Sequence, residues 1–217
     1  MRLKFELTGE TAILFHADDV IQGDSLKAWR ENPDNAAQSV RGDDRSPAWT
    51  WMSYLYSDGS HLAIPGDNLM AALRWAGAKM ILKKMETYKS LTQSGLLISS
   101  EFCTFQGTMG TISMAALDKI KSLSFAEQAA AVKALGFSLY VKRAKIGTAK
   151  HVRVRARFDE WTLSGQIEIL NSDISLEALR RIFDIAGDRA GLLDWRPSSK
   201  QSPGPFGRFT AKLTASK

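Results

Sequence analysis

The residues best suited to chemistry lie near the end of the chain, where stacking and phosphate-binding side chains stand among glycines. Trp195 and Arg196 precede Gly204, and Arg208 follows Gly207. Indole rings stack on nucleobases and guanidinium groups bind phosphate, while glycine permits positive φ angles and close backbone approach. Loops of this length are uncommon and often functional. We therefore expect this loop to contact a ligand, with a long surface turn as the alternative.

A strongly basic segment is the second candidate site. The net charge is +6, yet no acid occurs between Glu127 and Asp159. The rest of the chain is slightly acidic, so the positive excess belongs to this segment. Such a concentrated excess favours a polyanionic partner, chiefly nucleic acid, with an anionic lipid surface as the lesser alternative. The eight bases in the interval are Lys133, Lys142, Arg143, Lys145, Lys150, Arg153, Arg155 and Arg157.

Part of this basic segment has the pattern of a strand. From His151 to Phe158, small apolar residues alternate with Arg153, Arg155 and Arg157. Alternation places the three arginines on one face, where they could contact phosphates. The alternative is a solvated edge whose arginines pair with carboxylates from elsewhere in the chain.

Acidic side chains gather after the first strand, where they could hold Mg²⁺ or position a nucleophile near a phosphate. The alternative is a solvated loop balanced by Arg30, Arg41 and Arg45. No Gly-x-Ser-x-Gly elbow, Walker loop or dinucleotide fingerprint occurs, and the three histidines lack ligand spacing. We expect no catalytic residue, metal or cofactor. The acids are Asp18, Asp19, Asp24, Asp34, Asp43 and Asp44, and the histidines are His16, His61 and His151.

The single cysteine, Cys103, rules out a disulfide framework and a thiolate zinc site. The opening residues alternate as a strand does and contain no apolar signal core. No stretch approaches the roughly 18 apolar residues of a membrane span. We expect a cytoplasmic protein that makes no contact with a membrane.

Hydrophobic periodicity predicts a mixed succession of helices and strands. Residues 17–44 contain few large apolar side chains, so we expect an irregular excursion with a short helix near 26–29. The expected strands are residues 2–7, 12–15, 95–105, 138–143, 151–158, 161–170 and 208–214. The expected helices are residues 68–88 with Asp67 as N-cap, residues 124–136 with a capping box at Ser124 and Glu127, and a third helix that Ser175 caps.

Without its excursions, the chain reads βαββαβ, which indicates an α+β fold of the ferredoxin-like, RNA-recognition-motif type. In that layout both helices cover one face of an antiparallel sheet. The other face stays open and commonly takes bases and phosphates. We expect one domain over residues 1–217, with an irregular acidic insertion at about 17–60 and a basic insertion at about 106–150.

Three short stretches carry a resemblance to a known family. They are Ile-Pro-Gly-Asp-Asn-Leu at 64–69, Ala-Ala-Leu-Arg at 71–74, and the series Gly191, Trp195-Arg196 and Gly-Pro-Phe-Gly-Arg-Phe at 204–209. With the strand-first opening, they resemble the repeat-associated mysterious protein (RAMP) superfamily. The likeness is greatest to its backbone subunits, which polymerise along the guide RNA in CRISPR effector complexes. The chain is also similar to uncharacterised phage-encoded proteins.

The resemblance implies a ferredoxin-like palm, a thumb-like insertion at 106–150, and a strand of nucleic acid bound near the helix after Pro65-Gly66 and the terminal glycine loop. It implies backbone or base contacts by Arg74, Trp195, Arg196 and Arg208. RNA-cutting members use an Asp on a loop after the first strand, but no single Asp here matches that pattern. Asp67 stands where the family usually has Ser, which weakens the case for a phosphate contact there.

We therefore predict a non-catalytic subunit that binds single-stranded nucleic acid, with RNA as the leading hypothesis over DNA, and that repeats along a nucleoprotein filament with other copies or subunits. The alternatives are a metal-dependent RNA endonuclease, a phage single-strand-binding or annealing protein, and a mimic of a CRISPR subunit. The predicted nucleic-acid-binding residues are Arg74, Lys142, Arg143, Lys145, Lys150, Arg153, Arg155, Arg157, Trp195, Arg196, Gly204, Gly207 and Arg208.

Overall fold

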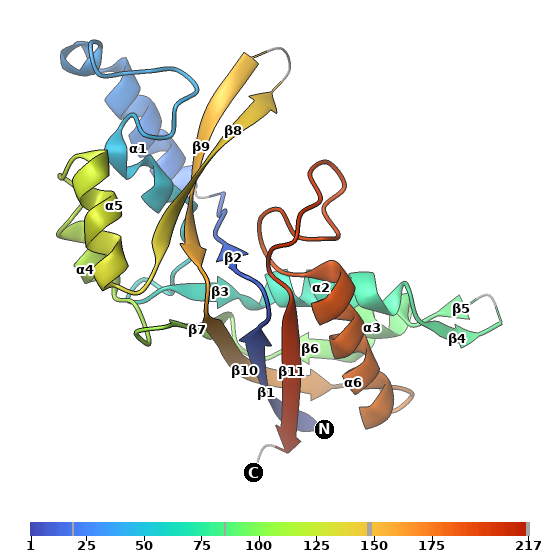
Figure 1. Cartoon of the computed structure of the whole chain (residues 1–217). Helices are drawn as coiled ribbons and strands as arrows, with labels where there is room; N and C mark the ends of the chain where they lie inside the picture. Colours follow the sequence, from blue (N-terminus) through green and yellow to red (C-terminus); the bar gives the residue numbers. More distant parts are fainter. Residues whose placement is uncertain (19, 85, 147–148, 216–217) are drawn as a thin grey trace.

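The computed structural model describes residues 1–18, 20–84, 86–146 and 149–215, and its central element is a six-stranded antiparallel sheet (Figure 1). The strand order is β11-β1-β10-β7-β3, and β6 also pairs with β10. The first and last strands of the chain are therefore neighbours, and the last strand, β11, lies at one edge of the sheet. The strands are β1 (Arg2–Gly9), β3 (Ala63–Pro65), β6 (Leu96–Ile98), β7 (Phe102–Gly107), β10 (Trp161–Ile169) and β11 (Phe209–Ala215).

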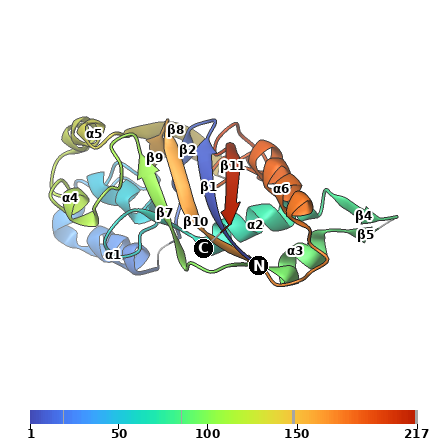
Figure 2. The ribbon, with the colours of Figure 1, turned by 90° about the horizontal axis from the view of Figure 1, so that it is seen from below.

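One face of this sheet is apolar and covered. In β1, Leu3, Phe5 and Leu7 are buried, and the polar residues between them are exposed. Helices α2 (Gly66–Gly77), α3 (Lys89–Gly95) and α6 (Leu176–Ile185) pack against one another and beside β6 and β11 (Figure 2). The rings of Phe5 and Phe183 lie 6.1 Å apart across this layer. The opposite face carries polar side chains, among them Lys4, Glu6, Ser164, Gln166 and Lys212.

A second, three-stranded sheet extends away from the first, and two of its strands form a long hairpin. It contains β2 (Ile13–Leu14), β8 (Ser138–Ile146) and β9 (Ala149–Phe158), in the order β2-β9-β8 (Figure 1). Its base is fixed by aromatic packing, because Phe158 lies 4.8 Å from Phe137 and 4.9 Å from Phe105 between ring centroids. Phe105 belongs to the six-stranded sheet, so this packing joins the hairpin to the main core.

The segment after β2 contains more helix than the sequence predicts. Helix α1 spans Val20–Glu31, followed by the 3-10 turns η1 (Pro33–Asn35) and η2 (Ala48–Tyr54). The short helix expected near 26–29 lies within α1, but the expectation of irregular chain at 20–25 is wrong. Helix α1 has no buried residue and exposes Val20 to 75%, so it lacks the apolar stripe on which the prediction relied.

The expected helix at 68–88 is also wrong beyond its first three turns. Helix α2 ends at Gly77, where α3 packs so closely that a side chain would collide with Thr92. The chain then forms a hairpin of β4 (Ile81–Lys83) and β5 (Glu86–Thr87) before α3 begins. The helix starts two residues earlier than expected, with Pro65 at the N-cap in place of Asp67 and no capping hydrogen bond from a side chain.

The remaining elements agree more closely with expectation. Helix α5 (Phe125–Ala134) has the predicted capping box, in which Ser124 and Glu127 bond reciprocally, and Ser175 caps α6 through the amide of Ala178. The expected strand at 95–105 is interrupted between β6 and β7. A short helix, α4 (Met114–Asp118), and a π-type turn (Ala186–Ala190) complete the described elements. No helix in the described part of the chain is long and apolar enough to cross a membrane.

Candidate functional site

The basic hairpin and the glycine loop (residues 191–208) meet around three aromatic rings. The ring of Tyr140 in β8 lies 5.8 Å from that of Trp195 and 5.6 Å from that of Phe206. Trp195 and Phe206 lie 6.5 Å apart, and Nζ of Lys142 lies 4.5 Å from the centre of the Trp195 ring. This aromatic cluster (Tyr140, Trp195 and Phe206) therefore joins two segments that were separate candidates in the sequence.

The register of the hairpin distributes its basic residues over two faces. Tyr140 lies opposite Arg155, and Lys142 lies opposite Arg153, so these side chains share the face toward the glycine loop. Arg157, opposite Ser138, belongs to the same face, as the alternation predicted. The residues of the other face near the hairpin's end are Arg143, Lys145 and Lys150.

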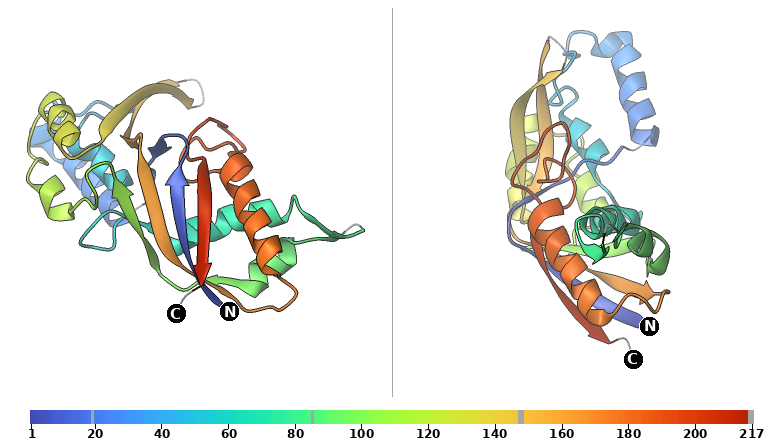
Figure 3. Two further views of the ribbon diagram at one scale, coloured as in Figure 1. Left: turned by 60° about the horizontal axis from the view of Figure 1, so that its bottom comes forward. Right: turned by 90° about the vertical axis from the view of Figure 1, so that its right-hand side faces the viewer.

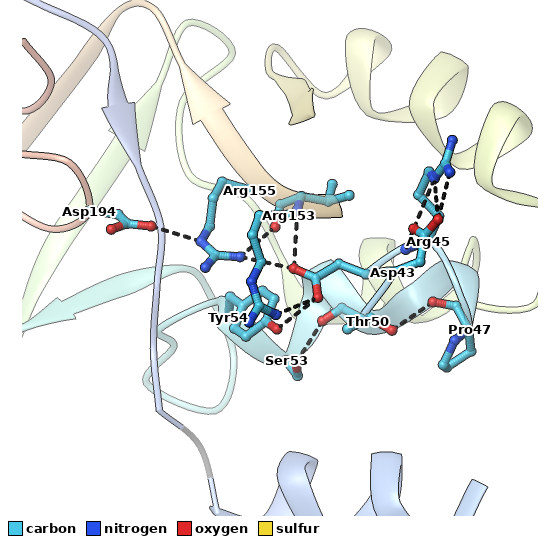
Figure 4. A network of polar contacts seen from close by, with 11 residues as sticks. Asp43, Arg45, Pro47, Thr50, Ser53, Tyr54, Arg153, Arg155 and Asp194 are labelled. Carbon is cyan, nitrogen blue, oxygen red and sulfur yellow. Dashed lines mark hydrogen bonds and ion pairs between the residues drawn. The ribbon is translucent and has the colours of Figure 1, made fainter. Parts of the chain in front are cut away.

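Arg155 is buried between two carboxylates. The sequence had suggested instead a side chain on an open face, available to contact phosphates. Its side chain is 5% exposed, with Nε 2.8 Å from Oδ2 of Asp194 and Nη1 3.2 Å from Oδ2 of Asp44. Arg153 reaches the other oxygen of Asp44 at 3.0 Å, and the guanidinium of Arg155 lies 4.2 Å over the ring of Tyr54 (Figure 4). Direct phosphate contact by Arg155 is thus corrected to a positioning role in a buried network.

Two more arginines of the predicted site are paired with carboxylates. Arg157 lies 2.6 Å from Asp159, and Arg208 lies 3.0 Å from the carboxylate of Asp188 and also donates to its carbonyl oxygen. The alternative interpretation, that the arginines of the strand pair with acids from elsewhere, therefore describes Arg153 and Arg155 well. The partners come from outside the acid-free interval in every case.

The other predicted cations are not neutralised by any carboxylate that the structure describes. Lys142, Arg143, Lys145 and Lys150 are exposed along the hairpin, and Arg74 is exposed on α2. Arg196 is half-buried, and it donates from Nη1 to the carbonyl oxygen of Leu193 at 2.7 Å and from Nε to Oγ of Ser198 at 3.2 Å. Because these partners are uncharged, the guanidinium is held in place while its charge stays available for an anion.

A pocket of about 420 Å³ separates helix α2 from the glycine loop. Trp75 and Asn68 line it from the helix, and Arg196 and Lys200 line it from the loop. Lys79 lies 5.3 Å from the centre of the Trp75 ring. The pocket therefore combines an aromatic ring with basic and amide side chains, which suits a ligand that has a planar ring and a negative charge.

The glycines of the loop serve its internal packing. Gly207 has a φ angle of +74°, and a side chain there would collide with the backbone of Leu192. A side chain at Gly204 would collide with the carbonyl oxygen of Trp195. Close approach, which the sequence suggested for a ligand, is here an approach of the loop to itself that sets the position of Trp195.

Tyr54 is half-buried beside this network, and the ring of His16 lies against it, although part of the His16 side chain is exposed. The sequence offered His16 only as one of three scattered histidines and did not single out Tyr54. Their rings lie 5.3 Å apart. Burial, followed by the charge of Arg155, lowers the pKa of His16 below its usual value, whereas burial and the charge of Asp44 raise the pKa of Tyr54. The acid-free interval was the signal in the sequence that could have pointed to this network. It contains no carboxylate, so a buried arginine there needed a partner such as Asp44 or Asp194 from outside the interval.

Comparisons with protein-family models and with curated proteins gave no match. The resemblance to the RAMP superfamily therefore stays a prediction. The functional assignment rests on the side chains of this chain and their contacts.

The acidic excursion does not form a metal cluster within the part of the chain that the structure describes. There, no three His, Cys, Asp or Glu side chains come together. Asp18, Asp24 and Asp34 are exposed, Asp43 and Asp44 are bound by arginines, and Asp19 lies outside the described residues.

Elsewhere, burial raises the pKa of Cys103 to about 12, so its sulfur stays a thiol at neutral pH.

Proposed function

We propose that the protein binds single-stranded RNA as a non-catalytic subunit, with the hairpin and the glycine loop as its main contact surface. The aromatic cluster beside Lys142 carries this proposal. Aromatic rings can stack on bases of any sequence, and flanking cations that lack carboxylate partners can bind the phosphates between them. Lys142 and Arg196 supply this charge beside the cluster, and Arg143, Lys145 and Lys150 extend it along the other face near the end of the hairpin.

We further propose a ferredoxin-like core for the six-stranded sheet. The sequence of elements β1, α2, β6 with β7, β10, α6 and β11 is a βαββαβ series, and the spatial order β11-β1-β10-β7 puts the last strand beside the first. All of these pairings are antiparallel. The open face is mostly polar, so we place the bound strand at the hairpin and the glycine loop and not on the sheet.

The proposal extends to a RAMP-like subunit that repeats along its nucleic acid. Two features support it: α2 after Pro65-Gly66 and the glycine loop line one pocket, and the predicted thumb at 106–150 contains α4, α5 and β8. Both agree with what the resemblance implies. Electron microscopy with and without RNA tests the assembly, and filaments or rings formed on RNA would support it.

Binding to a fluorescein-labelled single-stranded RNA of about 30 nucleotides, followed by anisotropy at increasing salt, tests the contact surface. We expect the triple variant K142A/K145A/K150A to bind at least tenfold more weakly and to have a shallower salt dependence, because each lost phosphate contact reduces counterion release. The matched control is K89A/K119A/K133A, which removes three exposed lysines outside the surface.

Equal affinities of the two triple variants would contradict the proposal. A labelled single-stranded DNA of the same sequence measures the preference for RNA. Cleavage of the RNA in the presence of Mg²⁺, if lost in the variants D18N or D24N, would support the nuclease alternative in place of a non-catalytic subunit.

A further inference from the structure

A second pocket lies between α1, η2 and the turn that precedes α5, and none of its lining residues belongs to the proposed RNA surface. In the left view of Figure 3, α1 (blue) and α5 (yellow-green) lie apart from the glycine loop (red). Its volume is about 470 Å³. Trp29 of α1 and Trp49 of η2 line it, together with Arg45 and Lys121. It shares no residue with the pocket between α2 and the glycine loop.

A lysine without an acidic partner lies against one of these indoles. Nζ of Lys121 is 5.0 Å from the centre of the Trp49 ring, and both side chains are half-buried. Among the described residues, no carboxylate lies within ion-pair distance of Lys121. A partly desolvated ammonium group beside a ring is a favourable position for an anion that also has a planar, stackable part.

The position of Lys121 is fixed from the protein interior. Gln128 is fully buried, and its Nε2 donates to the carbonyl oxygens of Lys121 at 3.0 Å and Leu123 at 2.9 Å. Its Oε1 accepts a hydrogen bond from Nε1 of Trp51 at 2.7 Å. Trp51 and Trp49 belong to the same turn of η2. The buried amide of Gln128 therefore fixes both sides of the pocket, the η2 side through Trp51 and the other side through the backbone of Lys121 and Leu123.

The pocket also has polar groups that are free to bind. Nε and Nη2 of Arg45 bond to Asp43, but no bond of its Nη1 to a described residue is present. Gln38 lines the pocket with an exposed side-chain amide, which offers both a donor and an acceptor. The N-terminus of α5 is closed by the capping box of Ser124 and Glu127, so an anion here would be bound by side chains.

We propose that this pocket binds a nucleoside monophosphate unit, whose base stacks on Trp49 and Trp29 and whose phosphate contacts Lys121. Arg45 adds a donor to the phosphate, and the amide of Gln38 faces the base edge. The site is separate from the proposed RNA surface and does not depend on it. The unit comes either from a free nucleotide or from the end of a strand, since both present the same base and phosphate.

The indole N–H signals of the six tryptophans provide a direct test. In a ¹⁵N-Trp-labelled sample, with signals assigned by single Trp→Phe variants, AMP and UMP are titrated first and a 5′-phosphorylated RNA hexamer second. We expect the signals of Trp29 and Trp49 to shift with saturation. Trp51 and Trp161 serve as references, because their N–H groups are bonded within the protein.

The variant K121A should weaken this binding at least fivefold, whereas K119A, an exposed lysine two residues earlier, should leave it unchanged. Shifts with AMP or UMP identify a free nucleotide as the source, and shifts with the hexamer alone identify a strand end. If the signals of Trp29 and Trp49 respond to neither at millimolar concentration, or respond equally in K121A, the proposal is overturned. Shifts of Trp75 and Trp195 report the RNA surface independently.

Discussion

Nε of Arg155 lies 2.8 Å from the carboxylate of Asp194, and this ion pair connects the basic hairpin to the glycine loop. The other end of the same guanidinium contacts Asp44. Arg155 thus bridges three segments: β9, the stretch before η2 and the loop that carries Trp195 (Figure 4). Together with the aromatic cluster, this side chain sets the relative position of the two walls of the proposed RNA surface.

Replacing Arg155 with alanine should lower the free energy of unfolding by about 3 kcal/mol, because Asp194 loses its guanidinium partner and the buried Asp44 keeps only one of its two arginines, Arg153. Urea denaturation measures the effect. The matched control is Arg157→Ala, whose partner Asp159 is 65% exposed, and we expect a loss below about 1 kcal/mol there. A loss for Arg155→Ala as small as that of the control would show that the network is dispensable.

Removing the ring of Trp195 should weaken RNA binding by about 1 to 3 kcal/mol, since that is the usual contribution of a base stacked on an aromatic side chain. Trp195→Leu keeps an apolar side chain next to Tyr140 and Phe206, whereas Trp195→Phe keeps a stacking ring. Anisotropy titrations should show a large loss for the leucine variant and a small loss for the phenylalanine variant. The same affinity for both would argue that the ring packs and does not stack on RNA.

Strands β1, β10 and β11 of the main sheet were predictable because their apolar residues alternate and one face is buried. The three-residue strand β3 was not predicted, and β6 and β7 were expected as one strand. Helix α1 was not, since no residue in it is buried and its sequence has no apolar stripe. The end of α2 was missed for another reason. The apolar spacing continues to Met80, but the helix stops at Gly77 where α3 packs against it, a contact between segments that no local pattern contains.

The residues of the candidate site could be predicted from the sequence, but the ion pairs among them could not. The excess of bases and the glycine loop identified both walls of the surface. Which arginines are free depends on Asp44 and Asp194, which lie far from Arg155 in the sequence and close to it only after folding. Lys142 and Arg155 look alike in the sequence, yet one is exposed and the other buried.

Stability should increase with pH through the range in which His16 titrates. Because its pKa is lower in the folded state, the unfolded chain binds more protons between that lowered value and about 6.5. Its contribution is therefore complete above about pH 6.5 and is lost as the pH falls toward the folded pKa. Urea denaturation from pH 5 to 7.5 should show a flatter dependence for His16→Gln, with His61→Gln, outside the arginine network, as control. Parallel curves for the wild type and His16→Gln would contradict this assignment.

Substitution of Gly207 tests whether the glycine loop is held by its own backbone. Its amide donates to the carbonyl oxygen of Ala12 at 2.8 Å, and its carbonyl oxygen accepts from the amide of Leu192 at 2.9 Å. Gly207→Ala combines a left-handed φ angle with a collision against Leu192, so we expect a loss of about 3 kcal/mol and weaker RNA binding. Gly59→Ala is the control, because Gly59 also has a positive φ angle but has open space around it, and about 1 kcal/mol of strain is expected. Equal losses in the two variants would mean that backbone strain alone, and not close packing of the loop, requires the glycine.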